Sequence, residues 1–108
     1  MRSQLAAVAA PKVLDNPSAP LARDAVAAHF VVVAQAEPGL LPRLVEPVAK
    51  LGFVPSRVHA SREAGDGSEM TVDLRLTDVP ARTAELVGMA LRAIVGVHRV
   101  SAVVEPQH

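Results

Sequence analysis

The sequence predicts an α+β domain in which four strands and two helices follow one another in the order βαββαβ. Strand-like runs of β-branched and apolar residues, two amphipathic segments with helical spacing, and turn-forming residues between them all indicate this order. At 108 residues, the chain is long enough for one hydrophobic core but too short for two domains. We therefore expect a single folded unit.

The first strand and the first helix are expected on either side of a Glu-Pro-Gly turn. Residues 29–35 form a β-branched apolar run, which is typical of a central strand buried on both faces. Apolar residues then recur at helical spacing over residues 40–51, and Gly52 marks the end of the helix. Pro47 lies inside this pattern, where a proline costs about 3 kcal/mol. We expect a kink or an early break of the helix there.

Two more strands follow, joined by a hairpin. Residues 54–61 alternate in polarity, and Pro55 favours a position at the edge of the sheet. Residues 64–68 accept positive φ angles readily and predict the hairpin connection. Residues 70–76 alternate strictly, which predicts a strand with one face in water.

A second helix and a last strand complete the pattern. Asp78 is expected as the N-cap of the helix, with Pro80 in its first turn. The helix ends before Gly96, and residues 97–104 form the final strand.

Two split β-α-β units of this kind form a ferredoxin-like sandwich, with a four-stranded antiparallel sheet and both helices on one face. The first and third strands lie in the middle. Phe30, Val32 and Ala34 should face the helices. The residues expected on the open face are Val31, Val33, Thr71, Asp73 and Arg75.

The two ends of the chain differ from its centre. Residues 1–28, with three prolines between positions 11 and 20, are expected to form a poorly structured arm with a helical turn around residues 21–28. The folded domain spans residues 29–105, and residues 106–108 are a tail. No segment approaches the roughly 20 apolar residues of a membrane span, so no membrane contact is expected.

Composition excludes several classes of function. Lys and Arg together number 11, as do Asp and Glu, and the aromatic residues are Phe30 and Phe53 alone. A nucleic-acid partner is not expected, because it requires basic charge and usually stacking rings. The absence of cysteine excludes disulfides, thiol catalysis and Cys-ligated metals, and a cytoplasmic location is expected.

Catalytic and metal chemistry have little support in the sequence. His59 could face Asp73 or Arg75 across the open sheet, but no nucleophile or oxyanion donor accompanies them. The other histidines, at strand ends or the terminus and without paired spacing, are His29, His98 and His108. We expect no enzymatic activity, no metal and no cofactor.

The loop between the first strand and the first helix is the candidate binding site. Gly39 has no Cβ, so a ligand or a neighbouring backbone could approach closely, and free N–H groups at the helix start could hold a carboxylate. The same Pro38-Gly39 pair is equally compatible with an ordinary tight turn. The residues alone leave both interpretations open.

Several segments resemble the ACT domain, a small regulatory module that binds amino acids. They are Val32-Val-Ala-Gln-Ala-Glu-Pro-Gly-Leu-Leu-Pro-Arg-Leu-Val, Leu51-Gly-Phe-Val-Pro-Ser, Ser68-Glu-Met-Thr-Val and Val97-His-Arg-Val. The chain is most similar to the ACT domain of the acetolactate synthase small subunit, whose loop reads Asn-Glu-Pro-Gly. The resemblance covers about residues 29–105.

The resemblance implies a homodimer formed by pairing the second strands into one eight-stranded sheet. An amino acid would bind between the 36–41 loop of one chain and residues 54–56 of its partner. The implied ligand-binding residues are Ala36, Glu37, Gly39, Leu40, Leu41, Val54 and Ser56. It also implies a partner, the catalytic subunit of a biosynthetic enzyme, with acetolactate synthase as the first choice.

Two departures from the family pattern affect this site. The position of Ala36 usually holds Asp or Asn, and that of Val54 is commonly Asn in the small-subunit group. The pocket is therefore more apolar, and branched-chain amino acids are the first ligands to consider. One alternative is a structural oligomerisation domain with a degenerate site. Another is a stand-alone effector-binding domain, although residues 1–28 are too rich in proline for a helix-turn-helix.

Overall fold

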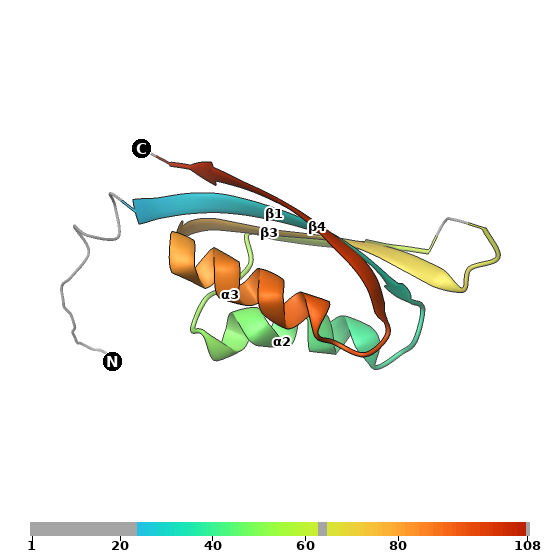
Figure 1. Ribbon diagram of the computed structural model, residues 1–108. Helices are drawn as coiled ribbons and strands as arrows, with labels where there is room; N and C mark the ends of the chain where they lie inside the picture. Colours follow the sequence, from blue (N-terminus) through green and yellow to red (C-terminus); the bar gives the residue numbers. More distant parts are fainter. Residues whose placement is uncertain (1–23, 63–64, 108) are drawn as a thin grey trace.

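The computed structural model describes residues 24–62 and 65–107 of the chain. Its elements are β1 (Ala25–Gln35), α2 (Leu40–Lys50), β2 (Arg57–Ser61), β3 (Glu69–Pro80), α3 (Ala81–Arg92) and β4 (Val97–Pro106) (Figure 1). This is the predicted βαββαβ order.

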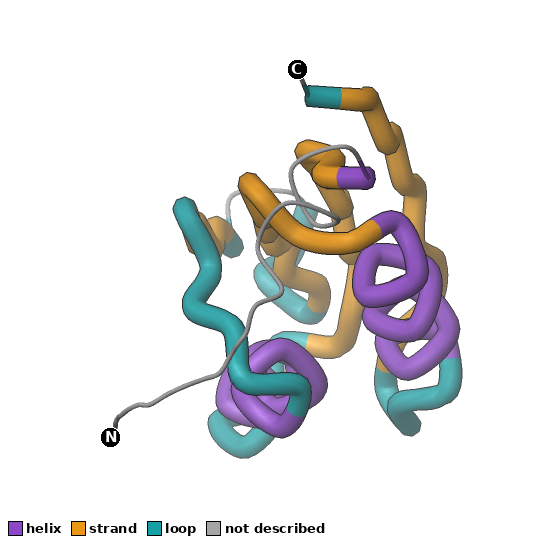
Figure 2. The backbone as a smooth tube through the Cα atoms, turned by 90° about the vertical axis from the view of Figure 1, so that its left-hand side faces the viewer, coloured by secondary structure: helices purple, strands orange, loops and turns teal. Residues whose placement is uncertain are grey.

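The strands form one antiparallel sheet in the order β2-β3-β1-β4. Both helices lie on one face of it (Figure 1 and Figure 2). The predicted fold class is confirmed, with β1 and β3 in the centre and β2 at an edge. In the register, Val32 of β1 lies opposite Val72 of β3 on one side and Val100 of β4 on the other.

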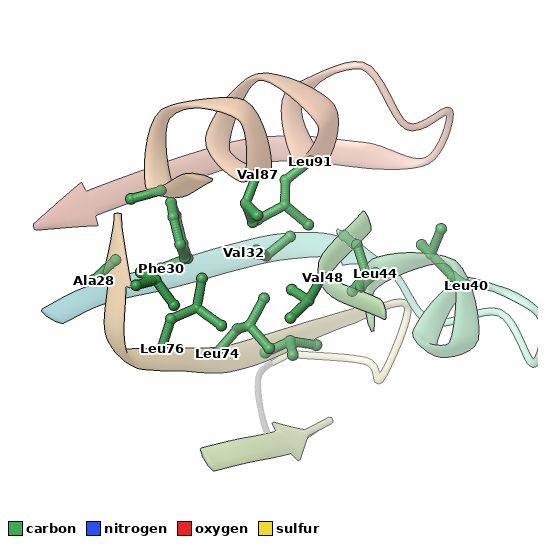
Figure 3. Packing of buried hydrophobic residues seen from close by; sticks show 14 of the residues in the cluster. Ala28, Phe30, Val32, Leu40, Leu44, Val48, Leu74, Leu76, Val87 and Leu91 are labelled. Atoms are coloured by element: carbon green, nitrogen blue, oxygen red, sulfur yellow. The ribbon is translucent and has the colours of Figure 1, made fainter. Parts of the chain in front are cut away.

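The core lies between the sheet and the helices (Figure 3). Phe30, Val32 and Ala34 all point into it, as predicted from the alternation of β1. The helices contribute Leu40, Leu44, Val48, Val87 and Leu91. Full burial of a Val, Leu or Phe side chain stabilises a fold by about 1.5–3 kcal/mol, so these contacts hold the helices to the sheet.

β1 begins at Ala25, four residues earlier than the sequence pattern predicts. The predicted arm over residues 1–28 therefore divides into two parts. Residues 1–23 lie outside the described part of the chain, whereas residues 25–28 are strand and not a helical turn. Strand pairing on both sides of β1 outweighs the helix propensity of the alanines, because Val26 lies opposite Val79 of β3 on one side and Pro106 of β4 on the other.

Pro47 does not end α2, which continues to Lys50. The expected early break is therefore wrong. Leu44 and Val48, on the two sides of Pro47, are both buried in the core. Their burial outweighs the roughly 3 kcal/mol cost of a proline inside a helix.

Asp78 is not the N-cap of α3. It lies within β3 at a φ of 56°, and its N–H donates to the Gln107 Oε1 at 2.7 Å. The N-cap position is held by Pro80, which makes no side-chain cap. The strand pairing of β3 with β1 extends to Pro80, so the helix starts only at Ala81.

The remaining differences concern the sheet edges. β2 begins at Arg57, so Val54 and Pro55 precede the strand, and β4 reaches Pro106 in the expected tail. Of the two helices in the described residues, neither is long and apolar enough to cross a lipid bilayer.

Candidate ligand-binding site

A hollow of about 470 Å³ lies where β1 leaves the sheet, beside the end of β2. Its lining residues are Ala36, Glu37, Pro38, Leu41, Ala60, Ser61, Arg62 and Met70. β1 and β2 are both antiparallel to β3, so they run in the same direction and their carboxyl ends lie at the same end of the sheet. The loop after β1 and the last residues of β2 meet for this reason.

Backbone hydrogen bonds hold the loop after β1 in place. The Ala36 N–H donates to the Ser68 carbonyl at 2.9 Å, and the Glu37 N–H to the Gln35 carbonyl at 3.0 Å. The Leu40 N–H donates to the Glu37 carbonyl at 3.1 Å. The Leu40 N–H is thus already bonded and Pro42 in the first turn of α2 has no N–H, so the predicted carboxylate site at the helix start has fewer free donors than expected.

Gly39 occupies an ordinary backbone conformation. Its φ is −85°, which any residue adopts, and a Cβ there would come no closer than 3.7 Å to the Arg43 guanidinium. The glycine is therefore not required by the turn. Its exposed position at the start of α2 leaves open space rather than a tight cradle.

The predicted site residues fall into three groups. Ala36, Glu37 and Leu41 line the hollow. Leu40 has no exposed surface and packs in the core, so it does not line the hollow. Val54 and Ser56 lie at the opposite end of β2, where the Ser56 N–H donates to the Arg75 carbonyl at 2.8 Å.

The residues that the end of β2 contributes to the hollow were not predicted from the sequence. Arg62 is the most important of them, because it is the positively charged residue among those that line the hollow. The Arg62 Nε and Nη2 donate to the Gly67 carbonyl at 3.2 and 2.9 Å, which holds the side chain against the hairpin. The predicted strand order already placed this end of β2 beside the loop, so the signal was available.

The hollow joins an apolar wall to two opposite charges. Ala36, Pro38, Leu41, Ala60 and Met70 supply the wall. The Glu37 carboxylate and the Arg62 guanidinium lie among the same lining residues. Such a site can accept a small molecule that carries both a positive and a negative group beside an apolar one.

The open face of the sheet holds the predicted histidine and carboxylate residues. His59 lies opposite Asp73 in the register, but the Asp73 carboxylate contacts the His29 Nε2 and approaches the Arg75 Nε to 3.8 Å. Within residues 24–62 and 65–107, no group of three or more His, Asp or Glu side chains could hold a metal ion.

A larger hollow of about 680 Å³ lies between α2 and α3. Its walls are mostly apolar and include Leu51, Leu86 and Ile94. It contains none of the predicted site residues and lacks the adjoining loop and strand end that shape the smaller hollow. The smaller hollow is therefore the better candidate for a ligand-binding site.

The fold and the pocket at the end of its central strand define a small α+β domain with a candidate ligand-binding site. A family model described as an ACT-like domain matches residues 22–107. The chain belongs to this family. The predicted resemblance to ACT domains is confirmed at this level.

Solved structures agree with the fold. The ACT domain from GTP pyrophosphokinase of Chlorobium tepidum superposes with a TM-score of 0.60 at 16% identity, covering 73% of this chain and 99% of that chain. The C-terminal domain of the MgtC protein from Mycobacterium tuberculosis has a TM-score of 0.59 at 16% identity, covering 75% and 88%. At such identities the likeness concerns the fold alone. No curated protein matches the sequence.

Proposed function

We propose that the protein is a regulatory module that binds an amino acid beside the β1–α2 loop and acts on a partner enzyme without catalysing a reaction itself. The observation that carries the proposal is the presence of both Glu37 and Arg62 among the residues that line a largely apolar hollow. The ammonium group of an amino acid meets the Glu37 carboxylate, and its carboxylate meets the Arg62 guanidinium. Hydrogen bonds to charged groups contribute about 1.5–3 kcal/mol each.

The apolar wall selects the side chain of the ligand. Leu41 and Met70 offer aliphatic surface, and Ala36 removes the polar group that other ACT domains have at its position. A branched-chain amino acid matches this wall best, because a polar side chain would leave its hydrogen bonds unsatisfied there.

A second copy of the chain completes the pocket. β2 is a free edge of the sheet, and two β2 strands can pair antiparallel about His59. In this register Ser56 of the second copy lies opposite Arg62, and Arg57 of the second copy lies opposite Ser61. Val54, which is 87% exposed in one chain, then covers the open side of the hollow. The active form in this proposal is a homodimer.

The partner enzyme is proposed from the sequence resemblance alone. The loop Ala36-Glu37-Pro38-Gly39 and the Gly52-Phe53 pair are similar to those of the acetolactate synthase small subunit. We propose the catalytic subunit of acetolactate synthase as the partner. Binding of the ligand and binding of the partner enzyme are linked by one coupling free energy. If the ligand changes the affinity for the partner, the control of the enzyme is reversible.

Thermal melting with a full panel of amino acids at millimolar concentration, beginning with valine, leucine and isoleucine, tests the pocket. A ligand at about 100 times its dissociation constant adds about 2.7 kcal/mol, which raises the melting temperature of a small domain by about 10 °C. Glu37→Gln and Arg62→Gln should each weaken binding about tenfold or more. Arg82→Gln and Glu85→Gln, which alter an exposed ion pair on α3, are the matched controls.

The possible outcomes separate the alternatives. No shift with any amino acid contradicts ligand binding and favours a structural oligomerisation domain. A shift that survives both pocket variants shows that the ligand binds elsewhere. A shift with amino acids of other classes would favour the effector-binding alternative.

The partner is tested by mixing the protein with the catalytic subunit from the same organism. Acetolactate formation is then measured with and without valine. Stimulation that valine abolishes supports the complete proposal, and stimulation that valine leaves unchanged supports an activator without feedback. No complex and no change in rate would show that the partner is wrong.

A further inference from the structure

β4 is the second free edge of the sheet, and it differs from β2 in length and exposure. It runs for ten residues, Val97–Pro106, and no strand in the described part of the chain pairs with its outer side. Val103 and Val104 are 58% and 48% exposed. A long apolar strand with unpaired backbone groups is a template for another strand.

The hydrogen-bond pattern shows which residues of β4 point outward. The Gln107 N–H donates to the Ala25 carbonyl at 2.9 Å, and Val26 lies opposite Pro106. Bonded and non-bonded pairs alternate along an antiparallel ladder. The odd-numbered residues from Arg99 to Glu105 therefore bond to β1, while the backbone groups of Val100, Ala102 and Val104 face away from the sheet. Pro106, which has no N–H, belongs to the outward set.

The charges of β4 are arranged symmetrically about its centre. Arg99 lies three residues before Ala102, and Glu105 lies three residues after it. Both are paired with open-face residues of β1, Val33 and Ala27, so both side chains lie on the open face. When two such strands run antiparallel about Ala102, each Arg99 comes opposite Glu105 of the other copy.

We propose that β4 pairs with β4 of a second copy of this chain, antiparallel and centred on Ala102. The outward N–H and C=O groups of Ala102 bond to those of Ala102 in the second copy. Val100 exchanges hydrogen bonds with Val104 of the other chain in the same way. The two Arg99–Glu105 pairs fall at non-bonded positions, where facing side chains are closest.

Other registers that keep the outward groups paired are less favourable. A shift of the centre to Ser101 sets Arg99 opposite Val103, and a shift to Val103 sets Glu105 opposite Ser101. The second shift also places Pro106 opposite Val100, where a hydrogen bond is lost because proline has no N–H. The centre at Ala102 places Pro106 opposite His98, near the ends of the strands, and of these three registers it alone pairs both charges while Val100, Ala102 and Val104 all stay bonded.

A single engineered cysteine tests the register directly. The chain has no cysteine, so Ala102→Cys introduces one thiol per chain. Facing residues in a bonded pair have Cα atoms about 5.5 Å apart, within the range of a disulfide. Mild oxidation should therefore convert most of the variant into a covalent dimer.

Ser101→Cys is the matched control. It is an equally exposed neighbour, but in the proposed register it lies opposite Val103 and is too far from its own copy for a disulfide. Rapid cross-linking of Ser101→Cys, or no cross-linking of Ala102→Cys, overturns the proposal. His59→Cys reports the β2 pairing of the proposed function, so the failure of either interface is distinguishable from that of the other.

Charge reversal provides the second test. Glu105→Arg and Arg99→Glu each turn two attractive pairs into repulsive ones and should weaken β4 association about tenfold or more. The double variant with both changes restores opposite charges and should return to within about threefold of the original. Sedimentation of the full chain measures these constants. A double variant as weak as the single ones contradicts the proposed pairing.

Discussion

The two free edges of the sheet, β2 and β4, differ in their capacity to pair with themselves. β2 has five residues, and its charge comes from Arg57, with Arg62 directly after it. β4 has ten residues and carries one charge of each sign, Arg99 and Glu105, at equal distances from its centre. Self-pairing of β2 about His59 sets Arg57 opposite Ser61 and forms no ion pair, whereas self-pairing of β4 about Ala102 sets Arg99 opposite Glu105 twice.

This difference assigns separate roles to the two edges. The β2 edge gains little from its own side chains, and the hollow beside it contains the Glu37 carboxylate that its strand lacks. Pairing there benefits from a ligand that contacts both chains, so it can respond to ligand concentration. The β4 edge needs no ligand, because its backbone groups and charges are self-complementary. The sheet thus has one edge suited to regulation and one suited to assembly.

The largest expected effect on stability distinguishes the residues of β4 that bond to β1 from those whose backbone groups face outward. Ser101→Pro removes an N–H that bonds to Val31 of β1 and should lower the free energy of unfolding by about 1–3 kcal/mol or more. Ala102→Pro removes an outward N–H and should cost less than about 1 kcal/mol, while it abolishes β4 association. Urea unfolding at low protein concentration and sedimentation measure the two effects.

A larger loss of unfolding free energy in Ala102→Pro than in Ser101→Pro would contradict the proposed difference between the two sides of β4. In that case, the backbone groups that face outward belong to the odd-numbered residues of β4 and not to the even-numbered ones. The proposed β4 pairing would then lose its hydrogen-bond basis.

A smaller effect is expected at the β2 edge. Arg57 lies directly opposite Arg75 of β3, and like charges in this position are destabilising. Arg57→Glu should raise the free energy of unfolding by about 0.2–1 kcal/mol, and Arg57→Gln by less, because it removes only the repulsion. Urea unfolding at low and high salt measures both variants, and the gain should shrink with salt. A loss of stability in Arg57→Glu would contradict the charge argument for this edge.

The smallest effect concerns the hairpin that joins β2 to β3. Hydrogen bonds from the Ser68 side chain and N–H, the latter at 2.9 Å, lower the pKa of Asp66 below its usual value. A lowered pKa in the folded state means that the stabilisation is present above the usual pKa and is lost as the pH falls through the folded value. The unfolding free energy should therefore decline with acidification, and Asp66→Asn should flatten this part of the curve. An identical acid dependence in both proteins would show that Asp66 contributes nothing to it.

Much of the fold could be predicted from the periodicity of the sequence. The alternation of Phe30, Val32 and Ala34 identified the inner face of β1, and the helical spacing of Leu44 and Val48 identified that of α2. The errors occur where pairing or packing overrides a local signal. Ala25 and Val26 are strand because β3 and β4 flank them, and α2 passes Pro47 because core contacts outweigh one lost hydrogen bond.

The candidate site was predicted in part. The β1–α2 loop was proposed from the sequence, and its residues Ala36, Glu37 and Leu41 line the hollow. Leu40 belongs to the same loop but is buried, because successive helix positions point about 100° apart and only one of the two neighbours can face the hollow. Arg62 was missed as a pocket residue because it lies 25 positions from Glu37 in the sequence, and only the strand order brings the two together.

The sequence by itself determined the element order, the buried face of each element and the family, because these depend on the spacing of apolar residues and on short motifs within one segment. The tertiary structure fixes the extent of β1 and β4 and the core position of Leu40. It also decided which backbone groups of β4 point outward. Each of these depends on the register between strands that are distant in the chain, and no local pattern of residues specifies that register.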